Sequence, residues 1–149
     1  MNDEAATATA KPDGAARPYR ASPPRRILVV DDEACIRLLL TEVLAGSGYD
    51  VDVAEDGAAA WEALQAKSYD LLITDHFMPR VTGLELIKHL RSARMDLPVV
   101  MAAGELPVRE MARNPSLDLA ATLLKPFTMD ALIDTVKTCF AEPCPQPQS

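Results

Sequence analysis

Short apolar runs alternate along this chain with longer segments in which hydrophobic residues recur every three or four positions. The apolar runs predict buried β-strands, and the longer segments predict helices with one buried face. The predicted strands lie at about 26–31, 50–54, 69–75, 98–102 and 119–124. The predicted helices lie at about 33–46, at 57–67, after Thr82, at 106–113 and after Thr128. Five strands alternating with five helices predict an α/β fold whose parallel sheet is covered on both faces.

Polar residues mark the expected starts of several helices, because a side-chain oxygen can accept a hydrogen bond from the free amides of a first turn. Asp32 is expected to cap the first helix, and Thr128 the last. Thr82 and Glu85 have the spacing of a capping box. The first helix should pack through one apolar stripe, which consists of Ile36, Leu39, Leu40, Val43 and Leu44.

The two ends of the chain differ in composition from its middle. Residues 1–25 are rich in alanine, proline and charge, with almost no large apolar residue, and residues 141–149 contain three prolines. Such segments cannot bury enough apolar surface to fold, so both are predicted to be disordered tails. The folded domain is therefore expected at 26–140.

The charge of the chain is uneven. The whole chain carries −7, whereas residues 1–26 carry +2, so the remainder carries −9. An acidic folded unit disfavours contact with a nucleic-acid backbone, which requires a basic surface, and we expect no DNA binding by the chain itself. No apolar run approaches the roughly 20 residues of a membrane span, so no membrane association is expected.

The three cysteines, Cys35, Cys139 and Cys144, lack the spacing of a metal site. An odd cysteine count without a signal peptide is typical of a reducing compartment, which predicts a cytoplasmic protein. Cys35 and Cys139 are expected to be buried or half-buried, and Cys144 to be a free thiol in the tail.

Charged residues directly follow three of the predicted strands. Asp31 and Asp32 follow the first strand, Asp75 the third and Lys125 the fifth. Ligands of open α/β sheets bind at the carboxyl ends of the strands, so neighbouring strands would bring these groups into one pocket. Mg²⁺ prefers oxygen ligands, and carboxylates can accept phosphoryl groups covalently. The pattern predicts a site for a divalent cation and a phosphoryl group.

These residues also have structural interpretations. Asp31 and Asp32 could form only a helix cap and a first-turn acid favoured by the helix dipole. Lys125 could form a salt bridge to Asp75, which is compatible with a functional role. The equivalent strand-end positions of Asp75 and Lys125 favour the functional site.

Four motifs together resemble a known family. They are Val29-Val30-Asp31-Asp32-Glu33, Asp75-His76-Phe77-Met78-Pro79, Gly83, and Lys125-Pro126-Phe127. Their order and spacing resemble the receiver domain of bacterial two-component response regulators over about 115 residues. The resemblance implies a flavodoxin-like doubly wound sheet with strand order 2-1-3-4-5.

The same resemblance implies the roles of the site residues. Asp75 would be the phosphoacceptor, and Asp32 and Asp75 would ligate Mg²⁺. Asp31 would act on the metal through water, the backbone carbonyl of Phe77 would complete the protein ligands, and Lys125 would contact the phosphoryl group. His76 is expected to be an exposed, neutral neighbour.

Two positions depart from the family pattern. The family places a threonine or serine near the end of the fourth strand, where this chain has Ala103. It also places an aromatic residue three positions before the lysine, where this chain has Thr122. An alanine methyl group cannot donate a hydrogen bond, so both halves of the usual switch are expected to be missing.

The resemblance implies a stand-alone phosphoacceptor that takes a phosphoryl group from a histidine kinase or His-phosphotransfer protein. It would act through contact with an unknown downstream protein, as a monomer or weak dimer. It would not be an enzyme beyond Mg²⁺-dependent self-phosphorylation and self-dephosphorylation.

Two other interpretations stay open. Ala103 and Thr122 favour a degenerate receiver that serves as a phosphorylation-independent interaction module. A phosphatase with an aspartyl intermediate would usually carry a second acid two residues after the nucleophile, but that residue here is Phe77.

Overall fold

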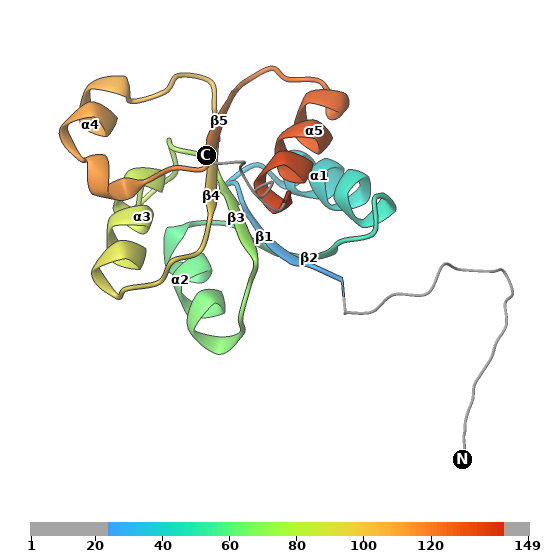
Figure 1. Ribbon diagram of the computed structural model, residues 1–149, viewed down its shortest axis with the longest axis horizontal. Helices are drawn as coiled ribbons and strands as arrows, with labels where there is room; N and C mark the ends of the chain where they lie inside the picture. Colours follow the sequence, from blue (N-terminus) through green and yellow to red (C-terminus); the bar gives the residue numbers. More distant parts are fainter. Residues whose placement is uncertain (1–23, 142–149) are drawn as a thin grey trace, which may run out of the picture.

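The computed structural model describes residues 24–141, and almost all of both predicted tails, with Cys144, lies outside them. The described chain forms one five-stranded parallel sheet in the order β2-β1-β3-β4-β5 (Figure 1). The strands are β1 (Arg26–Val30), β2 (Asp50–Ala54), β3 (Leu71–Thr74), β4 (Val99–Ala103) and β5 (Ala121–Leu124). The helices are α1 (Ala34–Gly46), α2 (Gly57–Ala66), α3 (Gly83–Ser92), α4 (Val108–Arg113) and α5 (Met129–Phe140), with a 3-10 helix, η2 (Pro115–Leu117). The predicted fold and strand order are confirmed.

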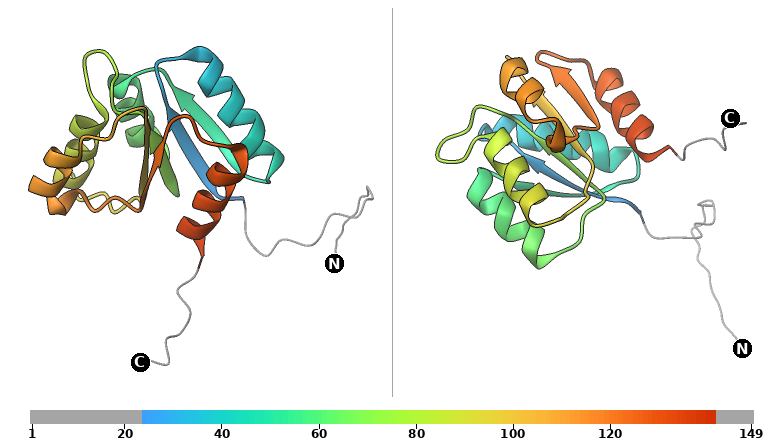
Figure 2. Two further views of the ribbon diagram at one scale, coloured as in Figure 1. Left: turned by 90° about the horizontal axis from the view of Figure 1, so that it is seen from above. Right: turned by 60° about the vertical axis from the view of Figure 1, so that its left-hand side comes forward.

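Helices cover both faces of the sheet. α1 and α5 lie on one face, and α2, α3 and α4 lie on the other, as the views in Figures 1 and 2 show. Successive residues of β1 point to opposite faces, so Ile27 packs under α1 and α5 while Leu28 packs under α2 and α3. Two cores therefore share one sheet, which explains why its central strands are almost uninterrupted apolar runs.

The helix starts agree with the sequence at two predicted positions and differ at one. The Thr82 hydroxyl and the Glu85 side chain form the predicted capping box, and Thr128 accepts a hydrogen bond from the Ala131 amide at 3.0 Å. The prediction that Asp32 caps α1 is wrong. Glu33 occupies that position, and its amide donates to Asp31 Oδ1 at 3.0 Å. Asp31, two residues before Glu33, thus shapes the turn with its own side chain.

The buried stripe of α1 is narrower than predicted. Leu40 and Leu44 are buried, whereas Leu39 is 42% exposed and lines an open apolar groove with Phe127. The groove lies between α1 and the segment from Lys125 to Met129, and none of the described elements covers Leu39 there. Cys35 is exposed rather than buried, while Cys139 is half-buried as expected. No helix within residues 24–141 has the length and apolar character that crossing a bilayer requires.

The core under α1 and α5 should be sensitive to truncation. Leu132 of α5 is fully buried, whereas Leu38 of α1 is 61% exposed. We expect Leu132→Ala to lower the free energy of unfolding by about 2–5 kcal/mol, because it removes buried contacts and leaves a cavity. Leu38→Ala should change it by less than about 0.5 kcal/mol. Urea denaturation followed by circular dichroism would measure both, and equal losses would contradict this packing.

Candidate functional site

Backbone hydrogen bonds continue past the strands and fix the residues that follow them. The Asp31 amide donates to Ala54 O at 3.2 Å, the Asp75 amide to Val30 O at 3.0 Å, and the Lys125 amide to Ala103 O at 2.8 Å. These bonds prolong the parallel ladder by one residue on β1, β3 and β5. The side chains of Asp31, Asp75 and Lys125 are therefore held at one edge of the sheet by rigid backbone.

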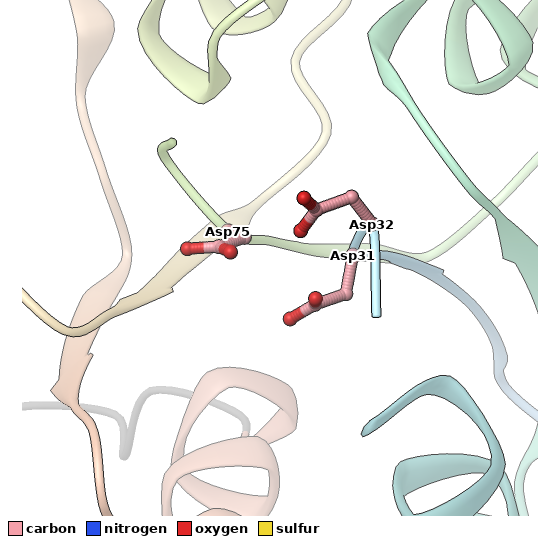
Figure 3. Close-up of side chains that lie close together, drawn as sticks. All are labelled: Asp31, Asp32 and Asp75. Atoms are coloured by element: carbon pink, nitrogen blue, oxygen red, sulfur yellow. The ribbon is translucent and has the colours of Figure 1, made fainter. Parts of the chain in front are cut away.

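Three carboxylates meet at this edge. One oxygen each from Asp31, Asp32 and Asp75 lies within 4.8 Å of the others. Figure 3 shows the side chains of Asp31 and Asp32, which follow β1, close to that of Asp75, which follows β3. Asp31 is buried, Asp75 is half-buried and Asp32 is exposed, so the cluster is open to solvent on one side. A set of close, partly hydrated oxygen atoms fits the ligand preference of Mg²⁺.

Lys125 supplies the positive charge next to this cluster. Its Nζ lies 2.8 Å from Asp31 Oδ2 and 3.4 Å from Asp75 Oδ2. The salt bridge to Asp75 that the sequence suggested is present, but the shorter contact is to Asp31. The four side chains predicted to meet therefore lie together, and the ammonium is shared between two carboxylates.

Burial and charge shift the pKa values of the groups in this cluster. Burial raises the pKa of the Asp75 carboxyl, and the Asp31 charge adds to the rise, against the opposing effects of the His76 amide and Lys125. Burial alone would lower the pKa of Lys125, but its bond to Asp31 and the charges of Asp31 and Asp75 raise it overall. The metal-free site thus disfavours a charged Asp75 and favours a charged Lys125.

Phe77 lies in the loop that connects β3 to α3, two residues beyond Asp75. Its ring is 59% exposed and packs edge-on against the His76 ring, with 4.6 Å between the ring centroids. The Phe77 carbonyl as a metal ligand stays a prediction.

His76 is buried, so the prediction of an exposed histidine is wrong. Its side chain is 7% exposed, and its Nδ1 is the one buried side-chain polar atom without a hydrogen-bond partner among residues 24–141. Burial lowers its pKa, which favours the neutral ring that was expected. His76 lies in the bend after Asp75, and the charges of Glu85 on α3 and Glu110 on α4 reach it.

The two positions that depart from the family pattern lie on β4 and β5. Ala103 ends β4 and is fully buried, while Thr122 is exposed and pairs with Met101 in the parallel register. Every residue of α4, the helix that follows β4, is exposed or half-buried. Ala103 is thus packed in the core, whereas α4 contributes no buried residue.

Two groups near the site were missed by sequence reasoning. The Arg37 guanidinium of α1 donates to Asp31 O at 2.7 Å and so braces the first acidic turn. Asp56 caps α2 by accepting from the Ala59 amide at 2.8 Å and forms an ion pair with Arg80. An aspartate before a helical segment signals a cap. A contact between residues far apart in the sequence leaves no local signal.

Comparisons with known proteins agree with this geometry. The family model described as "Response regulator receiver domain" matches residues 27–137. Response regulator MprA of Mycolicibacterium vanbaalenii is 36% identical over 124 residues, which are 82% of this chain and 53% of MprA. Sensor protein EvgS of Escherichia coli is 36% identical over 132 residues, 89% of this chain and 11% of EvgS. The chain thus spans about half or less of the length of these curated relatives.

Solved structures show the same fold. Chemotaxis protein CheY4 of Vibrio cholerae superposes with a TM-score of 0.73 and 28% identity, covering 78% of this chain and 99% of that one. Response regulator protein TrrA of Thermotoga maritima, solved in complex with Mg²⁺-BeF, gives a TM-score of 0.70 and 34% identity over 78% of this chain and 99% of that one.

The family match spans nearly all of the described sheet and helices, and the strand order and the acidic edge are those that the motifs implied. This chain belongs to the receiver domains of two-component response regulators.

Proposed function

We propose that this protein accepts a phosphoryl group on Asp75 from the phosphohistidine of a histidine kinase or His-phosphotransfer protein. The observation that carries the proposal is the convergence of Asp31, Asp32 and Asp75 within 4.8 Å, with the Lys125 ammonium against two of them. A purely structural receiver fold needs none of these four groups together. Relatives that are response regulators and a sensor protein, and a structural neighbour solved with Mg²⁺-BeF, support it.

The chemistry follows from the positions of the groups. A carboxylate oxygen of Asp75 attacks phosphorus, the P–N bond to the donor histidine breaks, and the electron pair leaves with the imidazole. Lys125 Nζ, already 3.4 Å from Asp75, moves onto an oxygen of the transferred group and balances its charge. Asp32, Asp75 and the Phe77 carbonyl would hold Mg²⁺, with Asp31 acting through water, and the cation would supply neutralisation of the charge on the phosphoryl oxygens.

Electrostatics in the metal-free site suit this role. The raised pKa of Asp75 reflects burial and a neighbouring carboxylate, which a bound cation would offset. The raised pKa of Lys125 keeps its ammonium charged at neutral pH. Arg37 and the strand-end hydrogen bonds hold the first acidic turn in place, so the site needs little rearrangement before the phosphodonor binds.

We further propose that phosphorylation is not transmitted through a hydroxyl and an aromatic side chain. Ala103 is fully buried at the end of β4 and has no hydroxyl group, and Thr122 is exposed on β5. A hydrogen bond to a charged group is worth about 1.5–3 kcal/mol, so this contribution to an active conformation is missing. Acceptance of the phosphoryl group does not depend on it.

Output would then occur through protein contact on the surface of α4, β5 and α5. Arg109, Glu110, Arg113 and Lys137 are exposed there and form a polar surface of both signs. The downstream protein is described only as one that fits this surface. We expect the receiver to be a monomer or weak dimer that does not bind DNA itself.

A phosphorylation-independent interaction module is the second candidate, favoured by Ala103 and Thr122. Asp75→Asn separates the two, because a partner that binds this variant and the phosphorylated wild type equally well would support the module. Partner binding that requires phosphorylated wild type would support the phosphoacceptor.

The first prediction concerns the phosphoacceptor itself. Incubation with acetyl phosphate and Mg²⁺ should add one phosphoryl group, seen by intact-mass spectrometry, and Asp75→Asn should abolish the addition. Lys125→Met should slow it by about tenfold or more, since a charge-assisted hydrogen bond is lost. Asp52→Asn, on β2 and outside the cluster, should react normally. Labelling that survives Asp75→Asn would refute the assignment.

The second prediction concerns pH. The folded-state pKa of Asp75 lies above its ordinary value of 3.8 because of burial, so ionised Asp75 destabilises the metal-free fold above that pH. Asp75→Asn should therefore be more stable than wild type at pH 7 in EDTA, and the gain should vanish as the pH falls below 3.8. Saturating Mg²⁺ should reduce this difference in stability between the variant and wild type, because it stabilises wild type. Thermal unfolding from pH 3 to pH 8 would measure it.

A control of opposite sign is available in Asp52. A hydrogen bond from Tyr69, followed by contacts with Lys67, lowers the Asp52 pKa, so its stabilisation is present above pH 3.8 and is lost as the pH falls. Asp52→Asn should destabilise the protein at pH 7. If Asp75→Asn also destabilised the metal-free protein at pH 7, the electrostatic account of the site would be wrong.

The third prediction concerns transmission. On phosphorylation, amide chemical shifts should change around the site but little across 104–123. Ala103→Thr combined with Thr122→Tyr should make the changes in 104–123 large, because a donated hydrogen bond of about 1.5–3 kcal/mol is introduced. Two-dimensional ¹⁵N spectra with and without the phosphodonor would compare the proteins. Large shifts in that region of wild type would contradict the proposal.

A further inference from the structure

The two ends of the loop between β3 and α3 are held together by backbone contacts. The Gly83 amide, at the start of α3, donates to His76 O at 2.8 Å. A Cβ atom on Gly83 would lie 2.2 Å from Asp75 O, so only glycine allows this close approach. These contacts close the base of the loop beside the backbone of Asp75, the proposed phosphoacceptor. Phe77 lies within the loop.

The far part of the same loop is held by a different element. Arg80 has a φ of 72°, a left-handed conformation that is unfavourable for a residue with a side chain and that persists only when its surroundings hold it. Its guanidinium pairs with Asp56 at the start of α2. Beside this pair, Val81 packs against Gly57, where a Cβ atom would lie 2.6 Å from the Val81 side chain.

Asp56 is a fixed anchor rather than a mobile surface acid. It is 5% exposed, and its Oδ1 already accepts from the Ala59 amide at 2.8 Å. That amide, together with Arg80, keeps the pKa of the Asp56 carboxyl below its usual range. Surface ion pairs usually contribute little because both side chains must be ordered, but here one partner is ordered already. The Asp31 amide bonds to Ala54 O, so this anchor also lies near the acidic cluster.

We infer that the Asp56–Arg80 ion pair is a positioning device that holds the β3–α3 loop, which carries the proposed ligand Phe77, and thereby sets the affinity for Mg²⁺. Neither residue touches the metal. The inference rests on the proposed function, because it concerns the cation that the cluster would bind. It adds a determinant of cation affinity that lies outside the four site side chains and joins α2 to the site.

The test uses the full chain and Mg²⁺ alone, with dissociation constants from calorimetric or amide-shift titration. Arg80→Gln should weaken Mg²⁺ binding by about tenfold, the lower end of the range for groups that hold metal ligands in place. Asp56→Asn should do the same while keeping the cap on α2, since asparagine caps as well as aspartate. The double variant should also lose about tenfold rather than a hundredfold, because both changes break one interaction.

Two further variants test whether a general structural change explains the result. Arg80→Lys keeps the charge and should recover part of the affinity. Lys67→Gln removes the exposed Lys67–Asp52 pair, which joins the end of α2 to β2 with 3.3 Å between Nζ and Oδ2, and should leave Mg²⁺ binding unchanged. Equal weakening in Lys67→Gln would overturn the inference.

A second readout needs no metal. In metal-free protein, hydrogen exchange at the Gly83 amide should be several-fold faster in Arg80→Gln than in wild type, while exchange at the Asp75 amide, bonded to Val30 O, should not change. If wild type binds Mg²⁺ and Asp32→Asn impairs binding, but Arg80→Gln changes neither affinity nor exchange, the inference fails and the proposed function stands. If wild type does not bind Mg²⁺, the proposed function fails.

Discussion

The contact between the Lys125 ammonium and the carboxylates of Asp31 and Asp75 is the interaction on which the site depends. Three carboxylates with oxygens within 4.8 Å of one another repel, and two of the side chains are partly or fully removed from water. Lys125, 2.8 Å and 3.4 Å from two of them, offsets that repulsion in the metal-free protein. A buried charge cluster of this kind is costly unless it is paired, and such pairing is more readily explained by chemistry than by stability.

This unfavourable cluster is possible because rigid backbone at the strand ends, rather than flexible loops, holds three of its four side chains. Asp31, Asp75 and Lys125 each follow a strand and are fixed by a backbone hydrogen bond that extends the sheet. The β3–α3 loop is also held in place, at Gly83 by a close backbone contact and at Arg80 by an ion pair to Asp56 at the start of α2.

The sequence predicted the fold and the members of the site because both follow from local patterns. Apolar runs mark buried parallel strands, and the residues after them must share one edge of the sheet. The sequence did not reveal how each side chain turns. Asp32 was expected to cap α1, but Asp31 shapes that turn, and Asp32 remains exposed. His76 was expected to be exposed, yet it lies in the bend after Asp75 with only 7% of its surface exposed. The Asp56–Arg80 pair joins distant segments and has no local signature.

Under the proposed function, acceptance of the phosphoryl group and the response to it depend on different side chains. Lys125 lines the groove beside α1 and the start of α5, whereas the charges of Glu85 on α3 and Glu110 on α4 act on His76, next to Asp75. The departures at Ala103 and Thr122 lie on β4 and β5, and α4 contributes no buried residue. Under the proposed function, the absence of a hydroxyl at Ala103 and of an aromatic ring at Thr122 would remove contacts to α4 and leave the acidic cluster intact. A receiver can change its mode of output in this way without losing the chemistry at its strand ends, because the two depend on different side chains.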